Sequence, residues 1–150
     1  MPLQSPVKPA PSPEAKPAVV LDTNATLDWL VFADGGMQTL GAAIEQGCVL
    51  WLASTRMRDE LARVLGYSNL ARWAPDAAQV MTTFDRCAQL CAEPAFCGWT
   101  CADADDQVFI DLASEKAARW LVTHDRALRA LARRARQRGI TVLPPREWAL

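Results

Sequence analysis

Apolar and polar positions along this chain predict short buried strands separated by amphipathic helices. Apolar runs rich in β-branched or aromatic residues, which are typical of buried strands, occupy 18–22, 48–54, 118–125 and 140–145. Elsewhere apolar residues recur every three or four positions, which predicts helices over 23–32, 37–47, 56–66, 75–93, about 105–117, and 126–139. This alternation predicts an α/β fold, a three-layer α/β/α arrangement with a mostly parallel central sheet.

The predicted helix boundaries follow from capping residues and helix breakers. We expect Asn24 to cap the first helix and Thr55 to cap the third, because both side chains accept hydrogen bonds from free backbone N–H groups. Gly47 and Gly139 would end the second and last helices. Pro94 would end the long helix over 75–93.

Composition indicates one folded domain, 18–150, behind a leader, 1–17. The chain has 150 residues, 51% of them hydrophobic, which is enough for a sizeable core. Six prolines fall in the leader, which is typical of an extended, disordered segment. No run of about 18 apolar residues occurs, and the leader has no apolar signal core, so we expect no membrane span and a cytoplasmic protein.

Five cysteines are an odd number, and reduced thiols fit a protein without a secretory signal. Cys87, Cys91, Cys97 and Cys101 are spaced three, five and three residues apart, which differs from the C-x2-C pairs of structural zinc sites. Cys87 and Cys91 are also expected one turn apart on an ordinary helix. We therefore predict no zinc site there.

Charge is unevenly distributed although the whole chain carries only −1. Residues 18–116 have a net charge of −8, and residues 117–150 have a net charge of +6. In the basic section, four arginines recur at helical spacing: Arg126, Arg129, Arg133 and Arg136. They form either a solvated helix face or a surface that follows a phosphate backbone without reading its sequence.

Two acids stand where a parallel sheet binds its ligands, at the carboxyl ends of strands. Asp22 ends the run "VVLD", and Asp125 ends "LVTHD". Each could simply cap the helix that follows it. Their common position at one edge of the sheet nevertheless makes both of them candidates for a functional site.

Helical periodicity separates further candidates from solvent-facing acids. In the helix over 56–66, Glu60 borders the apolar arc and Asp59 lies well outside it. In the helix over 105–117, Asp105 and Asp106 project on the apolar side of the first turn, and Asp111 lies on the polar face, in solvent. Glu60 and one of Asp105 and Asp106 therefore join the candidates.

Carboxylates gathered without histidine or thiolate partners are hard oxygen ligands, suited to Mg²⁺ or Mn²⁺. Mutual repulsion makes such a cluster unfavourable unless a cation lies among its members. Glu60 could instead pair with Arg56 or Arg63. Four coincidental acids, in this order on an α/β frame, are a poorer explanation than a metal site.

The ordered motifs "VVLDTN", "RDEL", "DADDQVFIDLA" and "WLVTHDRAL" resemble the PIN-domain family, the metal-dependent ribonucleases of VapC-like toxins, over about residues 18–148. The resemblance is strongest to the bacterial putative toxin component branch. It implies a catalytic, metal-binding acidic pocket of Asp22, Glu60, Asp106 and Asp125. It also implies that Asn24 and Thr123 are accessory polar residues, with Asp105 the alternative to Asp106. His124 occupies a position that varies in the family, and a lone histidine is more often structural.

Two other functions compete with this interpretation. The stretch "DTNAT" resembles the phosphatase loop of the haloacid-dehalogenase superfamily, but Asn24 stands where that chemistry needs a second aspartate. A catalytically silent domain that keeps the PIN fold for interactions is the other alternative, and the intact acid quartet argues against it. The chain has no P-loop and no dinucleotide-binding glycine motif.

The expected function is a Mg²⁺- or Mn²⁺-dependent endoribonuclease, the toxin of a type II toxin–antitoxin pair. A metal held by Asp22, Asp106 and Asp125 would polarise the scissile phosphate and activate water, and Glu60 would orient that water or help hold a second cation. The expected partners are RNA, a cognate antitoxin and a second copy of the chain, with Arg126, Arg129, Arg133 and Arg136 on the RNA side.

Overall fold

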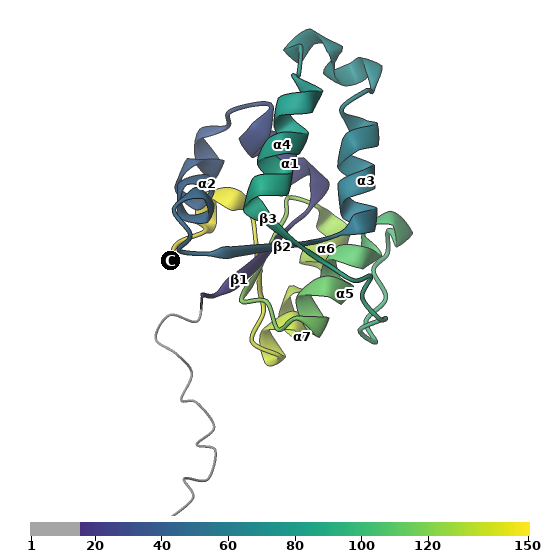
Figure 1. Cartoon of the computed structure of the whole chain (residues 1–150). Helices are drawn as coiled ribbons and strands as arrows, with labels where there is room; N and C mark the ends of the chain where they lie inside the picture. The colour runs from purple at the N-terminus through teal and green to yellow at the C-terminus, as the bar shows by residue number, and fades with distance from the viewer. Residues whose placement is uncertain (1–15) are drawn as a thin grey trace, which may run out of the picture.

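The computed structural model describes residues 16–150, so nearly all of the predicted leader lies outside the described residues. A sheet of five parallel strands forms its centre, in the order β3-β2-β1-β4-β5 (Figure 1). The strands are β1 (Ala18–Leu21), β2 (Leu50–Ser54), β3 (Ala88–Cys91), β4 (Trp120–Val122) and β5 (Thr141–Leu143). The predicted α/β class and parallel sheet are confirmed.

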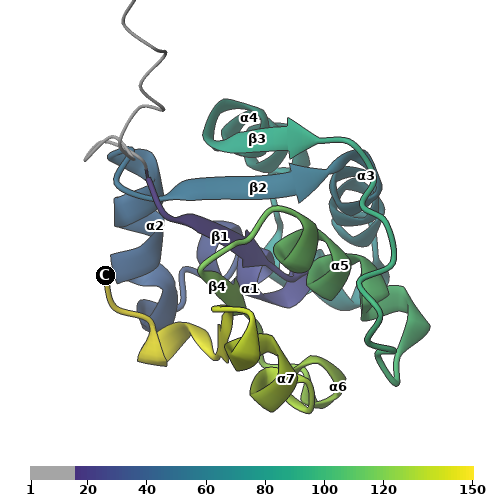
Figure 2. The same ribbon diagram turned by 90° about the horizontal axis from the view of Figure 1, so that it is seen from below.

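Helices cover both faces of the sheet, as the three-layer prediction requires. Figures 1 and 2 show α1, α2 and α4 on one face, and α5 with α6 and α7 on the other. The α-helices are α1 (Thr23–Leu30), α2 (Gln38–Glu45), α3 (Thr55–Val64), α4 (Ala77–Cys87), α5 (Gln107–Glu115), α6 (Arg126–Arg129) and α7 (Ala132–Gln137). Short 3-10 turns are η1 (Gly35–Met37), η2 (Ser68–Trp73), η3 (Ala104–Asp106) and η4 (Pro145–Glu147).

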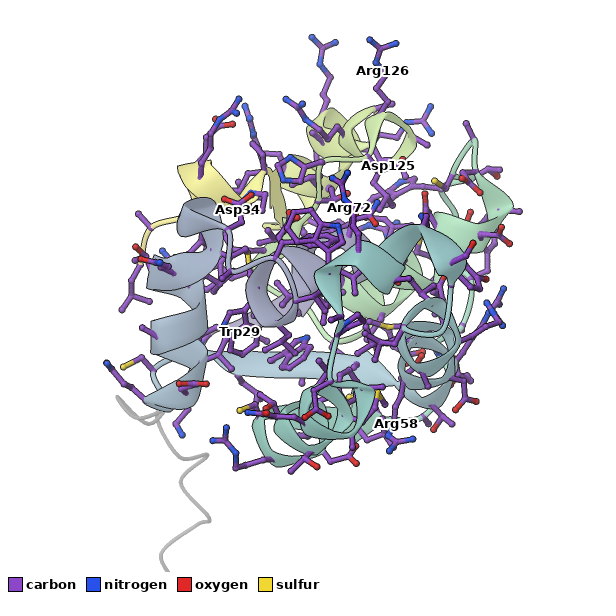
Figure 3. The ribbon with its side chains drawn as sticks, turned by 90° about the horizontal axis from the view of Figure 1, so that it is seen from above. Trp29, Asp34, Arg58, Arg72, Asp125 and Arg126 are labelled. Atoms are coloured by element: carbon purple, nitrogen blue, oxygen red, sulfur yellow. The ribbon has the colours of Figure 1, made fainter. Side chains whose placement is uncertain are left out.

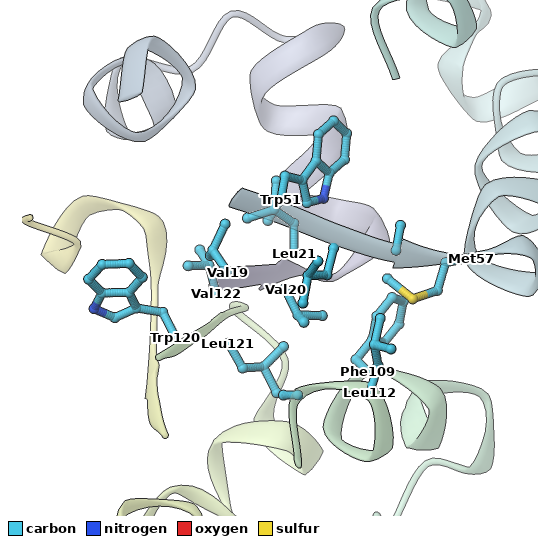
Figure 4. Packing of buried hydrophobic residues seen from close by; sticks show 14 of the residues in the cluster. Val19, Val20, Leu21, Trp51, Met57, Phe109, Leu112, Trp120, Leu121 and Val122 are labelled. Carbon is cyan, nitrogen blue, oxygen red and sulfur yellow. The ribbon is translucent and has the colours of Figure 1, made fainter. Parts of the chain in front are cut away.

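The core lies on both sides of β1 and β2, which are buried strands (Figure 4). On one face, Trp51 makes edge contacts with Trp29 of α1 and Phe84 of α4, at ring-centroid distances of 5.4 and 4.9 Å. On the other face, Phe109 and Leu112 of α5 are completely enclosed. Because these buried strands run in parallel, the residues after them meet at one edge of the sheet.

The predicted helix over 75–93 is wrong beyond Cys87. The helix α4 ends at Cys87, and the next four residues form the edge strand β3, paired with β2 from Trp51↔Ala88 to Ser54↔Cys91. Pairing with the free edge of β2 satisfies backbone groups that a local helical pattern cannot account for. Cys87 and Cys91 consequently do not share a helix face.

Three predicted details of the helix ends and of the last helix also change. Asp22, and not Asn24, caps α1, because the helix begins directly after the strand. Ser54, and not Thr55, caps α3 for the same reason. The predicted helix over 126–139 divides at Ala130 and Leu131 into α6 and α7. Among residues 16–150, no helix combines the length and apolarity needed to cross a bilayer.

Candidate active site

Asp22 lies at the carboxyl end of β1, where its carboxylate is held by two donors. The side chain is only 3% exposed. Its Oδ1 accepts a hydrogen bond from the N–H of Ala25 at 2.7 Å, and its Oδ2 accepts one from the hydroxyl of Thr123. The same aspartate therefore begins α1 and links β1 to the residue that follows β4.

Thr123 connects the two strand-end acids. The hydroxyl that donates to Asp22 also accepts a hydrogen bond from the N–H of Asp125 at 2.9 Å. The carboxylate of Asp125 in turn accepts from the N–H groups of Ala127 and Leu128 at the start of α6. Asp125 thus has the capping role that its position allows, while it remains at the same edge as Asp22.

Glu60 reaches this edge from α3 and is held there by Thr23. The hydroxyl of Thr23 donates to Oε2 of Glu60 at 2.8 Å. Glu60 is half-buried and Asp59 is exposed, as the helix periodicity predicts. Neither Arg56 nor Arg63 makes an ion pair with Glu60 within 4.0 Å among the described residues. Pairing with an arginine therefore does not account for Glu60.

Asp103, Asp106 and Asp125 form the tightest group of acids in the described part of the chain. One carboxylate oxygen from each lies within 4.8 Å of the others. Asp103 was not among the predicted site residues. Its side chain caps the turn η3 by accepting from the N–H of Asp105, so the local signal that could have identified it is the capping pattern "DADD".

A cleft of about 130 Å³ brings the four predicted acids together. It is lined by Asp22, Thr23, Asn24, Glu60, Val64, Asp106 and Asp125. Residues of α1, α3 and η3 therefore meet those that follow β1 and β4 at one place. The predicted accessory residues Asn24 and Thr123 also lie here, Asn24 in the lining and Thr123 beneath it as the link between two acids.

The η3 turn directs Asp105 and Asp106 to different places. Asp106 is half-buried in the acid cleft, whereas Asp105 is exposed and lines a second, larger cleft. Residues 104–106 form a 3-10 turn and not the first turn of α5, so α-helical angles do not describe them. The prediction that both side chains project on the apolar side is wrong for Asp105.

Burial and repulsion make this cleft unfavourable for free carboxylates. Burial raises the pKa of Asp22 to about 6, against the lowering effects of the Thr123 and Ala25 hydrogen bonds. Burial, together with repulsion from Asp125 and Asp103, raises the pKa of Asp106 to about 7. A cation among these groups would relieve both penalties. The donor set, made only of carboxylate, hydroxyl and amide oxygens, fits Mg²⁺ or Mn²⁺.

Asp111 does not lie in solvent, which overturns its predicted position. It is 7% exposed, and its Oδ1 accepts from the N–H of Cys97 at 3.0 Å and from Nε2 of Gln107 at 2.9 Å. The polar face of α5 is covered by residues 92–103, the segment between β3 and η3. Periodicity correctly identified a polar face of α5, but the backbone of a loop, and not water, forms hydrogen bonds with its side chains.

That loop is attached to α5 at three successive helical turns. Glu115 accepts from the N–H of Ala95, Asp111 accepts from Cys97, and the side-chain oxygen of Gln107 accepts from the N–H of Cys101 at 2.7 Å. Arg138 adds a hydrogen bond to the carbonyl of Cys97. These contacts hold the segment that leads directly into Asp103.

The predicted RNA-side arginines all lie on the surface. Arg126, Arg129, Arg133 and Arg136 are exposed, and none of them makes an ion pair within 4.0 Å of a described acid. Arg126 follows Asp125 directly and extends outward from the molecule (Figure 3). The division between α6 and α7 interrupts the single helical stripe that the sequence predicts.

The remaining motifs lie outside the lining of the acid cleft. The Nε2 of His124 lies 3.2 Å from Oδ2 of Asp28 on α1, next to the acid cleft but not in its lining. The five cysteines are free thiols, and they do not form a metal-ligand group within residues 16–150. Cys101 is buried, and burial raises the pKa of its thiol.

Comparisons with known proteins agree with this fold. Residues 18–127 match the PIN domain family. A chain in the crystal structure of VapBC2 from Rickettsia felis bound to a DNA fragment from their promoter is similar in fold, with a TM-score of 0.55 at 12% identity. The match covers 83% of this chain and 96% of that chain. No curated protein sequence matches. PIN domains are generally nucleases, and the chain belongs to the PIN-domain family.

Proposed function

We propose that this PIN domain is a divalent-metal-dependent endoribonuclease. The observation that carries the proposal is the acid cleft, in which Asp22, Glu60, Asp106 and Asp125 converge from separate elements. Family membership supports hydrolysis of a nucleic acid. The phosphatase alternative needs a second aspartate at position 24, where this chain has Asn24.

Asp106 and Asp125, with Asp22 beneath them and Asp103 beside them, would hold Mg²⁺ or Mn²⁺. When bound, such an ion polarises a phosphodiester and lowers the pKa of water. Thr123 keeps Asp22 and Asp125 in a fixed relation through its two hydrogen bonds. Thr23 holds the carboxylate of Glu60 at the cleft wall, where Glu60 can orient the attacking water and accept its proton.

The biological setting we propose is a toxin–antitoxin pair. The resemblance to VapC-like toxins and the similarity of fold to a VapBC2 chain support a cognate antitoxin as the protein partner. The exposed arginines Arg126, Arg129, Arg133 and Arg136 would attract the RNA backbone from the side of α6 and α7. A homodimer stays a prediction.

Cleavage of an RNA oligonucleotide blocked at both ends tests the proposal. We expect internal cuts with Mg²⁺ or Mn²⁺, none with EDTA, and little cutting of the matched DNA. Glu60→Gln should abolish the cuts, whereas Glu45→Gln makes the same change on an exposed residue of α2 and should leave them. RNA that stays intact with every metal would contradict the proposal and favour the silent interaction domain.

A further inference from the structure

A second cleft of about 610 Å³ adjoins the acid cleft, and Glu60 lines both. Its other lining residues come from α3, the β3–η3 loop and η3: Thr55, Arg56, Asp59, Arg63, Glu93 and Asp105. Its volume lies within the range of about 300–1,000 Å³ typical of ligand pockets. A chain that enters the acid cleft can therefore continue past Glu60 along α3.

Two arginines flank Glu60 on the same helix face. Arg56 precedes Glu60 by four residues and Arg63 follows it by three, so all three side chains project on one side of α3. Neither arginine makes an ion pair within 4.0 Å of a described acid. Arg63 uses its Nε to donate to the phenol oxygen of Tyr67 at 3.3 Å, which leaves the terminal nitrogens of its guanidinium available.

Tyr67 continues this face beyond the end of α3. Its side chain is exposed by 46%, one of few large hydrophobic side chains so exposed in the described chain. The contact with Arg63 places the phenol group beside a guanidinium. Exposed aromatic rings beside a cationic group are the usual platforms on which the bases of single strands stack.

We propose that Arg63 and Tyr67 form a nucleotide subsite for single-stranded RNA, in which Arg63 binds a phosphate next to the scissile one and a base stacks on Tyr67. The proposal rests on the nuclease function proposed above and names the path of its substrate. The same cleft also contains Asp59, Glu93 and Asp105, whose negative charges repel a free anion. The subsite would therefore bind a phosphate only as part of an RNA whose scissile phosphate is held by a cation in the acid cleft.

Binding of a labelled single-stranded RNA dodecamer in Ca²⁺ tests the subsite, with the RNA checked on a gel after each titration. Tyr67→Ala should weaken binding about tenfold, since loss of one base stack has this size. Tyr67→Phe keeps the ring and should bind nearly as the wild type. Arg63→Gln should lower the slope of log affinity against log salt by about 0.7.

The control is Arg86→Gln, which removes the same charge from an exposed site on α4 that lines neither cleft. It should leave RNA affinity unchanged apart from a small electrostatic effect. Wild-type affinity and an unchanged salt slope in both Tyr67→Ala and Arg63→Gln would overturn the subsite.

Hydrolysis of bis(p-nitrophenyl) phosphate tests the proposed nuclease activity separately from the proposed subsite. That diester has no neighbouring nucleotide, so Tyr67→Ala should raise the KM for RNA by a larger factor than the KM for the diester. A wild-type protein that hydrolyses neither the diester nor RNA contradicts the nuclease, and the binding titration still decides the subsite. Equal loss on diester and RNA would show that Tyr67 supports the acid cleft and would overturn the stacking role.

Discussion

Thr23 and Glu60 are separated by 37 positions, yet the hydroxyl of Thr23 donates a 2.8 Å hydrogen bond to Oε2 of Glu60. Thr23 directly follows Asp22, so one dipeptide supplies both a buried acid and the group that orients a second acid. The same contact joins α1 to α3 at the mouth of the cleft. Thr23 is therefore a positioning residue that the sequence motif alone did not identify.

Replacement of Thr23 tests this positioning role. Thr23→Val keeps the branched shape and removes the donor, so Glu60 gains freedom and the cleavage rate should fall about tenfold, which corresponds to about 1.4 kcal/mol. Thr23→Ser keeps the hydroxyl and should retain most of the activity. Single-turnover kinetics measure both rates. Equal losses in the two variants would show that packing, and not the hydrogen bond, is what matters at this position.

Asp22→Asn should abolish RNA cleavage and leave the fold intact. The amide oxygen can still accept from Ala25, and a neutral side chain is cheaper to bury than a carboxylate, so thermal stability without metal should hold or rise. Stabilisation by added Mn²⁺ should be lost or strongly reduced. Thermal melts with EDTA and with Mn²⁺ give both quantities. Wild-type cleavage by this variant would remove Asp22 from the site.

Stability without metal should depend on pH through Asp22 and Asp106. Their pKa values of about 6 and about 7 lie above the value near 4 of an unfolded aspartate, so between these limits the folded protein binds more protons. The free energy of unfolding contributed by these groups therefore falls as pH rises from about 4 to about 7. Asp106→Asn should remove its part of this fall, measured as the difference between wild-type and variant melts in EDTA.

Mn²⁺ should restore stability at pH 8 and do so less at pH 5.5, because protons compete for the same oxygens. Ligand at one hundred times its Kd adds about 2.7 kcal/mol to the free energy of unfolding.

For the metal-free protein, identical pH profiles of wild type and Asp106→Asn in EDTA would contradict the electrostatic account of the cleft.

Local sequence was sufficient to predict those features of the fold and site that depend on neighbours in the chain. Short apolar runs identify buried strands in the sequence. Parallel strands bring the residues that follow them to one edge of the sheet, so Asp22 and Asp125 could be placed together. Helix periodicity then distinguished Glu60 from Asp59, because α3 is a regular helix.

Long-range pairing accounts for what sequence reasoning missed. The strand β3 forms because β2 has a free edge with which it can pair, and the sequence of residues 88–91 does not indicate this pairing. Asp111 binds the backbone of a loop that returns from β3, so its polar surroundings are invisible to helical periodicity. Asp103 was not predicted to be a site residue for a related reason, since it lies beside Asp106 and Asp125 at the end of this loop.

Asp111 gives the sharpest test of that loop. Asp111→Ala leaves the partly buried N–H of Cys97 without its acceptor. A fully buried donor without a partner costs about 1–3 kcal/mol, so we expect a loss at the low end of this range. Asp111→Asn keeps an acceptor oxygen at the same place and should cost clearly less. Urea unfolding measures both free energies.

The loop also carries Asp103 into the acid group, so the consequences of Asp111→Ala should extend beyond stability. Mn²⁺ affinity should fall although no carboxylate of the Asp103, Asp106 and Asp125 group has been changed. Glu115→Ala, which frees the exposed N–H of Ala95 one turn further along α5, serves as the matched control and should lower both quantities less. Wild-type stability and Mn²⁺ affinity in Asp111→Ala would mean that the loop keeps its place without α5, and that Asp103 owes its position to the η3 turn alone.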